Sequence, residues 1–263
     1  MGVPKQTQAQ IRGDLIRRLF AVAISVGAAN TLSRMQWVTN GCWPDLHEWQ
    51  QLSILVAATV ATVLSWDGYL LSIEDRPLLG FWRFAIDITL VFIYMFLLMT
   101  SQHRTWWLFI HALTFVLYVV WDFLTVREHT DKYYPPDAIP ESNKRSILDV
   151  YIRGLEDRDR PSRSPIITIG WAIYFCLLYL INRRGLDDRV FTTTIFALAG
   201  LILYRQDKKH RWTLKTRSLV VVGLLIFSGL NISFGPPDRV IWEVVGPYIG
   251  STYCVPENTQ SPS

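Results

Sequence analysis

The chain has 263 residues, of which 50% are hydrophobic and only 18% are charged. Its mean hydropathy is positive, at +0.21, and the charged fraction is below the roughly 25% that is usual for soluble domains. This composition argues against a disordered or nucleic-acid-binding protein and leaves a membrane protein as the predicted class. The net charge is only +4, so its distribution along the chain is more informative than its size.

Seven apolar segments follow one another along the chain, and each is a candidate membrane-spanning helix. A helix needs about 17 to 25 residues to cross about 30 Å of hydrocarbon, and the sixth segment is shorter than that. It needs a thinner bilayer, shielding by its neighbours or an extension beyond its apolar residues. The predicted fold class is therefore an all-α polytopic transmembrane bundle of about seven spans, in a single domain over residues 1–263. The segments are Leu15–Leu32, Leu52–Ser72, Phe81–Ser101, Thr105–Val126, Ile166–Asn182, Val190–Tyr204 and Ser218–Phe234.

The basic residues predict which side of the membrane each connection occupies. With the amino terminus placed in the cytoplasm, 20 Lys and Arg residues fall inside and six fall outside, as the positive-inside rule requires. An odd number of spans then places the carboxyl terminus outside. We expect a multi-pass protein of the plasma membrane or of a bacterial inner membrane. The weak point is the connection 182–189, which puts three arginines outside. The alternative is that segments five and six form one re-entrant hairpin, in which case this topology fails.

The connections and the first span carry further predictions. A cytoplasmic loop at 127–165 holds a proline-interrupted stretch and then a short amphipathic helix, and the tail 255–263 is expected to be disordered. Cys42 and Cys254 both fall on the oxidising outer side, so they are candidates for a disulfide.

The first span also carries a face of small side chains that would let another helix approach closely. This face is a candidate contact with a second copy of the chain or with a membrane partner. It consists of Ala21, Ser25 and Ala29.

Polar residues form one stripe on the third segment and another on the fourth. Their spacing of three, four or seven residues places each set on a single helical face. Because only a short turn around His103 joins the two segments, they should pack as an antiparallel pair. The stripes consist of Arg83, Asp87, Tyr94 and Ser101 on the third segment, and of His111, Thr114, Tyr118, Asp122 and Thr125 on the fourth.

Counting residues away from that turn predicts three pairs at matching depth, one ion pair and two hydrogen bonds. Exposing ionisable groups to lipid costs free energy, so these side chains should face protein or water. The six residues make up the candidate polar path. The predicted pairs are Arg83 with Asp122, Asp87 with Tyr118, and Tyr94 with His111.

Three functions fit two facing polar stripes inside a membrane. In the first, the stripes line a path for ions, protons or a small solute. In the second, the polar groups satisfy one another, and the protein is a scaffold, a sensor or an accessory subunit. In the third, a membrane-embedded enzyme uses the acids and the histidine as general acid and base. We place transport first, because a chain with many spans and little soluble mass has few other tasks.

The motifs of common enzyme and cofactor sites are missing from the sequence. It has no HExxH, GxSxG, paired CxxC, P-loop or GxGxxG motif, and its histidines are not spaced as metal ligands. No lysine falls within a predicted span, which excludes a retinal Schiff base there. We therefore expect no cofactor, no metal and no nucleic-acid partner, and we lean away from catalysis. The expected surroundings are the lipid bilayer.

Overall fold

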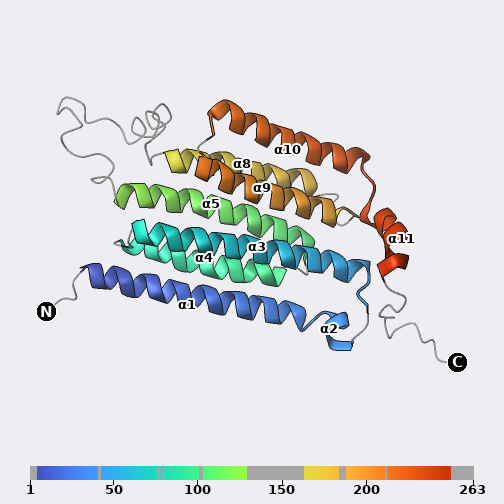
Figure 1. Ribbon diagram of the computed structural model, residues 1–263, viewed down its shortest axis with the longest axis horizontal. Coiled ribbons are helices and arrows are strands. Elements are labelled where there is room, and N and C mark those ends of the chain that lie inside the picture. The colour runs from blue at the N-terminus through green and yellow to red at the C-terminus, as the bar shows by residue number, and fades with distance from the viewer. Residues whose placement is uncertain are drawn as a thin grey trace.

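The computed structural model describes residues 5–40, 43–75, 78, 80–100, 103–128, 163–183, 188–210 and 212–249. The helix predicted within the loop 127–165, the disorder predicted for the tail 255–263 and the candidate disulfide between Cys42 and Cys254 lie outside these residues. The elements within the described ranges are all helices, and seven long ones run side by side in alternating directions (Figure 1). The long helices are α1 (Lys5–Leu32), α3 (Leu46–Asp75), α4 (Phe81–Met99), α5 (Arg104–Glu128), α8 (Arg163–Asn182), α9 (Val190–His210) and α10 (Leu214–Phe234), and the short ones are α2 (Gln36–Asn40) and α11 (Asp238–Ile249).

The all-α transmembrane bundle predicted from the sequence is confirmed. Six helices, all the long ones except α9, are long and apolar enough to cross a membrane. The seventh, α9, lies within the same bundle against α3, α8 and α10 (Figure 1). It continues past Tyr204 to His210 and so has 21 residues, about 30 Å of helix at 1.5 Å per residue. The extension makes the short sixth segment long enough to cross, and α8 and α9 are two full-length helices instead of one re-entrant hairpin.

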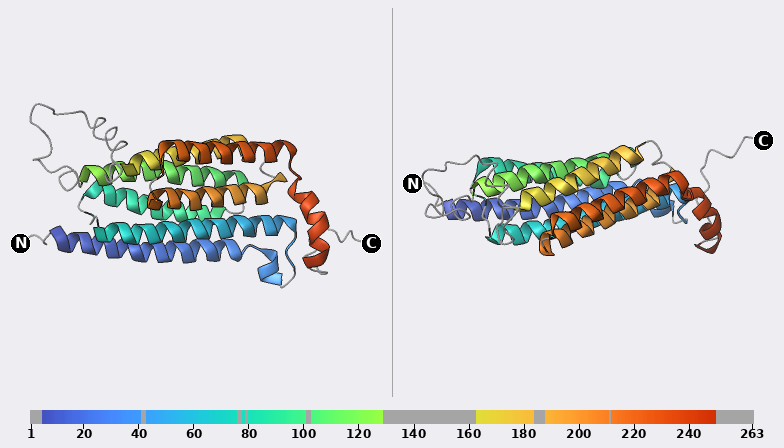
Figure 2. Two further views of the ribbon diagram at one scale, coloured as in Figure 1. Left: turned by 45° about the horizontal axis from the view of Figure 1, so that its top comes forward. Right: turned by 90° about the horizontal axis from the view of Figure 1, so that it is seen from above.

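The long helices form two layers (Figure 2). In one layer α1, α4, α5 and α8 follow one another, and in the other α3 packs on α9, while α10 lies against both α8 and α9. Helix α1 begins at one end of the bundle and α11 lies at the other (Figure 1). We call the end at which α1 begins the amino-terminal end, and the end at which α11 lies the carboxy-terminal end.

Local sequence signals set several helix boundaries. Asp45 caps α3 by accepting a hydrogen bond from the backbone nitrogen of Glu48 at 2.8 Å, and Thr213 caps α10 by accepting one from the backbone nitrogen of Thr216 at 3.2 Å. Such caps satisfy amide groups that have no partner within the helix. At its other end α10 stops at Gly235, whose backbone is extended and leads into two prolines.

Gly27 makes the close contact between α1 and α4. A Cβ atom on Gly27 would lie 2.8 Å from Leu98 Cβ, so only a glycine lets α1 approach α4 this closely. The predicted small-residue face points away from this contact: Ala21, Ser25 and Ala29 are all exposed. A contact between that face and a second chain stays a prediction.

Candidate functional site

The polar stripe of α4 faces the interior of the bundle. Arg83 is 0% exposed, Asp87 is 1% exposed and Tyr94 is 2% exposed. Because these residues are four and seven positions apart, they share one face of α4, and that face packs on α3 and α5. The helix thus keeps its ionisable groups away from lipid, as the cost of exposing them there demands.

The carboxylate of Asp87 is held by donors from two other helices. The indole Nε1 of Trp121, on α5, donates to Asp87 Oδ1 at 2.6 Å, and the hydroxyl of Tyr69, on α3, donates to Asp87 Oδ2 at 3.3 Å. Each carboxylate oxygen therefore accepts a hydrogen bond inside the bundle. Such bonds offset part of the cost of burying the acid.

Arg83 lies beside this group, towards the amino-terminal end. Its guanidinium carbon is 4.9 Å from the centroid of the Trp121 ring, which is within cation–π distance. Its Nη1 is 3.8 Å from Glu128 Oε2, at the end of α5. Trp121 thus contacts both charges of α4, with its nitrogen on Asp87 and its ring on Arg83.

Deeper in the bundle, the stripes of α4 and α5 meet at two tyrosines. The hydroxyl groups of Tyr94 and Tyr118 form a hydrogen bond with each other. The ring of Phe20, on α1, lies next to this pair, with its centroid 5.7 Å from that of Tyr94 and 5.8 Å from that of Tyr69. An aromatic ring of α1 therefore contacts both Tyr94 and Tyr69, the donor to Asp87.

His111 lies among aromatic rings. It is 3% exposed, and neither of its ring nitrogens has a hydrogen-bond partner among the described residues. Its ring centroid is 4.8 Å from that of Phe175, on α8, 5.8 Å from that of Trp107 and 5.9 Å from that of Phe115. Because Phe115 also packs on Tyr118, at 5.8 Å between centroids, it separates His111 from the tyrosine pair.

Asp122 turns away from α4 and joins α5 to the two following helices. Lys208 Nζ, on α9, lies 3.0 Å from Asp122 Oδ2, and the hydroxyl of Thr168, on α8, donates to the same oxygen. The ammonium group of Lys208 also lies 5.1 Å from the centroid of the Tyr204 ring. Asp122 is 1% exposed, so this ion pair lies at the meeting point of three helices.

All three predicted pairs between the two stripes are wrong, and each error shifts the partner on α5 in the same direction. On α5 the observed partner lies three to seven residues further along than the predicted one. Side chains on a helix point towards its amino terminus, so in an antiparallel pair long side chains meet only when their Cα atoms are offset along the axis. Matching Cα depth therefore selects the wrong partner. The observed partners are Glu128 for Arg83, Trp121 for Asp87 and Tyr118 for Tyr94, in place of Asp122, Tyr118 and His111.

A third buried carboxylate, on Asp207 of α9, was missed by sequence reasoning. Arg217, on α10, pairs with both of its oxygens, from Nε and from Nη2, and the indole Nε1 of Trp171, on α8, donates to Oδ2 at 3.0 Å. The predicted sixth span ends at Tyr204 and the seventh begins at Ser218, which places Asp207 and Arg217 in the connection between them. The signal that could have found them is the continuing helical spacing of Gly200, Tyr204 and Asp207, which share one buried face.

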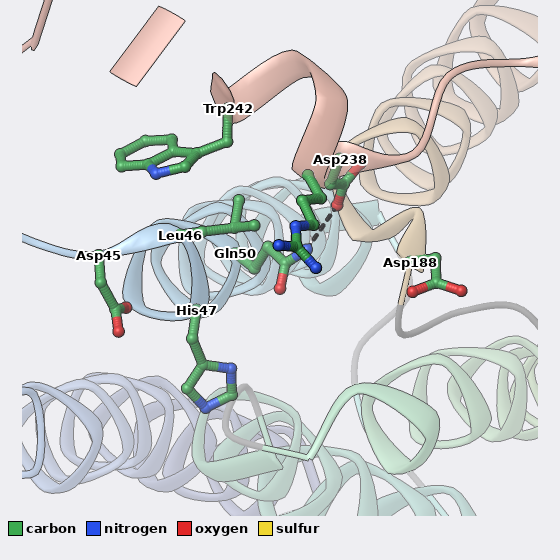
Figure 3. Close-up of a pocket in the computed structure, with 8 residues that line it drawn as sticks. Asp45, Leu46, His47, Gln50, Asp188, Asp238 and Trp242 are labelled. Carbon is green, nitrogen blue, oxygen red and sulfur yellow. Dashed lines mark hydrogen bonds between the residues drawn. The ribbon is translucent and has the colours of Figure 1, made fainter. Parts of the chain in front are cut away.

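A pocket of about 460 Å³ opens at the carboxy-terminal end of the bundle (Figure 3). Among its lining residues, Asp238 is 0% exposed. It accepts hydrogen bonds from Gln50 Nε2 at 2.7 Å and from the backbone nitrogen of Phe191 at 3.1 Å. These bonds tie the start of α11 to α3 and α9. The lining residues are Asp45, Leu46, His47, Gln50, Asp188, Asp238, Arg239 and Trp242.

In the part of the chain that the structure describes, no group of three or more His, Cys, Asp or Glu side chains is placed to hold a metal ion. Comparison of the chain with protein-family models, with curated proteins and with solved structures finds no match. The geometry of the bundle is therefore the basis for the functional proposal.

Proposed function

We propose that this integral membrane protein moves protons across the membrane along the facing polar side chains of α4 and α5. The single observation that carries the proposal is the position of Asp87, an acid that lies in the interior of the bundle with a donor on each oxygen. Ionisable side chains within membrane spans are rare and generally mark ion or proton pathways. Asp87 is the group that binds and releases the proton.

Protons are favoured over larger cargo by the close contacts along the stripes. The Tyr94 and Tyr118 hydroxyls bond each other directly, and Asp87 contacts the Trp121 indole at 2.6 Å. A hydrated ion or a solute would need to separate these groups, whereas hydrogen-bonded hydroxyl and carboxyl groups can pass a proton without doing so. We therefore narrow the cargo from ions, protons or small solutes to protons.

In this proposal the remaining stripe residues have distinct tasks. Arg83 holds Trp121 and Glu128 at the amino-terminal entrance, and the Tyr94–Tyr118 pair relays the proton in the centre. Water must bridge the step from Asp87 to this pair, beside the ring of Phe20. His111 receives it on the carboxy-terminal side of Phe115, whose ring must turn aside or admit water for the proton to pass. Asp122 is removed from the chemical path, because its partners Lys208 and Thr168 lie on α9 and α8, respectively.

We further propose that the amino-terminal end of the bundle faces the cytoplasm, in the plasma membrane or a bacterial inner membrane. The 20 basic residues counted on that side of the predicted spans support this orientation, because cytoplasmic connections are enriched in Lys and Arg. Arg83, Lys208 and Arg217 all lie in this half of the bundle.

The test is proton flux into vesicles that contain the purified protein. A potassium gradient with valinomycin sets the membrane potential, and a trapped pH-sensitive dye reports proton entry. Asp87→Asn should abolish the flux that the wild-type protein gives above empty vesicles. The matched control is Asp14→Asn, because Asp14 is an acid of α1 with a side chain 63% exposed. Wild-type flux no higher than that of empty vesicles would refute the proposal.

One set of contacts favours the second function, a non-catalytic scaffold or accessory subunit. The buried carboxylates Asp87, Asp122 and Asp207 each accept hydrogen bonds from other helices, so together they fix the relative positions of α3, α4, α5, α8, α9 and α10. A bundle built only for such rigidity would lose stability on Asp87→Asn and would carry no protons in any form.

A further inference from the structure

Helix α11 presents three different faces around its circumference. At 3.6 residues per turn, Asp238, Trp242 and Gly246 fall on one face, and Arg239 and Glu243 fall on the next. A third face consists only of apolar and aromatic side chains and spans about 140° of the helix. Its members are Val240, Ile241, Val244, Val245 and Tyr248.

The first face attaches α11 to the bundle. Asp238 bonds Gln50 of α3 and the backbone of Phe191 on α9, and Trp242 lines the pocket beside them (Figure 3). Gly246 is buried, and a Cβ atom there would lie 3.1 Å from the Trp242 ring. This side of the helix therefore carries its contacts with the bundle.

The second and third faces lie on opposite flanks of this attachment. On the polar flank Arg239 and Glu243 have side chains 82% and 63% exposed and pair with each other at 3.3 Å. On the apolar flank the five side chains are between 37% and 89% exposed, with Tyr248 the most exposed. A helix with one wet and one apolar flank is the pattern of segments that lie in the interfacial layer of a membrane.

We propose that α11 lies in the headgroup layer of the membrane leaflet at the carboxy-terminal end of the bundle, with its apolar flank inserted among the lipids and its polar flank in water. The helix crosses the carboxy-terminal end of the bundle at a steep angle to the membrane helices, from the end of α10 towards the end of α3 (Figure 1), and seen from above it projects beyond the layer of α3, α9 and α10 (Figure 2). This places it at the level of the membrane surface, with its start on the bundle and its projecting part over the lipid next to the layer of α3, α9 and α10.

Continuity with α10 identifies lipid as the occupant of the apolar flank. Helix α10 lies at the edge of the bundle. Its side chains Phe227, Leu230 and Phe234 are 66%, 48% and 84% exposed, so its outer face contacts lipid chains. Only Gly235, Pro236 and Pro237 separate this lipid-facing surface from α11. The apolar flank continues the same surface around the corner at the membrane boundary, where burial in lipid removes its side chains from water.

A consequence concerns the pocket at this end of the bundle. Trp242 and Arg239, which line it, are carried by α11, so lipid contact on the other flank holds one wall of the pocket in place. The pocket then opens at the membrane surface, beside lipid headgroups.

The test compares adjacent residues on the two flanks in vesicles of the full-length protein. Single cysteines are introduced by Val244→Cys and Glu243→Cys, and by Val240→Cys and Arg239→Cys as a second pair, after the native Cys42, Cys176 and Cys254 have been changed to serine. Each is labelled with an environment-sensitive fluorophore. Quenching is measured with phosphatidylcholine that carries a nitroxide on its acyl chain and, separately, with aqueous iodide.

We expect labels at 244 and 240 to be quenched several-fold more strongly by the nitroxide lipid than labels at 243 and 239, and iodide to give the reverse order. Equal iodide quenching on both flanks would overturn the proposal, because the apolar flank would then lie in water. Labels at 244 and 240 that neither quencher reaches would also overturn it, because a second copy or another protein would then cover that flank. The two pairs report independently if one variant fails to fold.

Discussion

The indole ring of Trp121 joins the two charges of α4, since its Nε1 donates to Asp87 at 2.6 Å while its face lies 4.9 Å from the guanidinium carbon of Arg83. Arg83 and Asp87 are one turn apart on the same helix, so a single side chain of α5 contacts both. An arrangement of this kind fixes the rotation and the depth of α5 against α4. Trp121 is therefore the residue on which the geometry around Asp87 most depends.

Trp121→Phe should destabilise the protein by about 1 to 3 kcal/mol, because it leaves a buried acceptor without its donor. The phenyl ring preserves the contact with Arg83, so the loss reports mainly the hydrogen bond to Asp87. Unfolding free energy in mixed detergent micelles is the measurement. Trp106→Phe serves as the control, because Trp106 is 60% exposed and its replacement should leave stability unchanged. Equal stability of the two variants would show that the indole does not hold Asp87.

Asp207→Ala should cost about 3 to 5 kcal/mol of unfolding free energy, because it leaves the buried guanidinium of Arg217 without its carboxylate. The double variant Asp207→Leu with Arg217→Met should be more stable than Asp207→Ala alone, since no buried charge then remains unpaired. Arg239→Ala is the matched control for loss of an exposed charge. If the double variant instead loses as much stability as Asp207→Leu alone and Arg217→Met alone added together, the pair is not the coupled unit that we describe.

Two glycines separate the effect of close helix contact from that of helix propensity. Gly27→Ala should destabilise by about 1 to 3 kcal/mol, because its new methyl group would overlap Leu98 and force α1 away from α4. Gly223→Ala, on α10, should be neutral or stabilising by up to about 1 kcal/mol, since nothing lies within 4 Å of a Cβ atom at that position. Thermal midpoints in detergent compare the two variants. Similar shifts for both would contradict the contact of α1 with α4.

His111→Phe should keep or raise stability, whereas His111→Ala should lower it by about 2 to 5 kcal/mol through the cavity that it leaves. The reason is that the imidazole is surrounded by aromatic rings and has no hydrogen-bond partner among the described residues, so an apolar ring fits its surroundings. Unfolding curves of the three proteins test this order. A loss for His111→Phe as large as that for His111→Ala would mean that an imidazole nitrogen makes a bond essential to the fold.

The membrane bundle could be predicted because it depends on properties that the sequence states directly. Long apolar runs mark the spans, whereas the direction in which they cross the membrane, inferred from the uneven distribution of Lys and Arg, stays a prediction. The burial of Arg83, Asp87 and Asp122 followed from the same reasoning, since ionisable groups within a span must turn away from lipid.

The partners of these groups could not be predicted in the same way. Which donor meets Asp87 depends on side-chain length and direction, and these offset the contacting residues of α5 by up to two turns from the Cα count. The ion pair of Asp207 with Arg217 was missed for another reason: an apolar window ends where charges begin, although α9 continues as a buried helix beyond it. The packing of α11 on the bundle depends on Gln50, which is far from it in the sequence.

Proton flux measured side by side for Asp87→Asn and Asp207→Asn tests the central claim most directly. Both acids are 0% or 1% exposed, both accept a hydrogen bond from an indole nitrogen and both lie near an arginine, but only Asp87 belongs to the path between α4 and α5. Our account predicts that Asp87→Asn stops flux and that Asp207→Asn retains it, per folded protein. Equal flux in the two variants, or none in the wild-type protein, would contradict it.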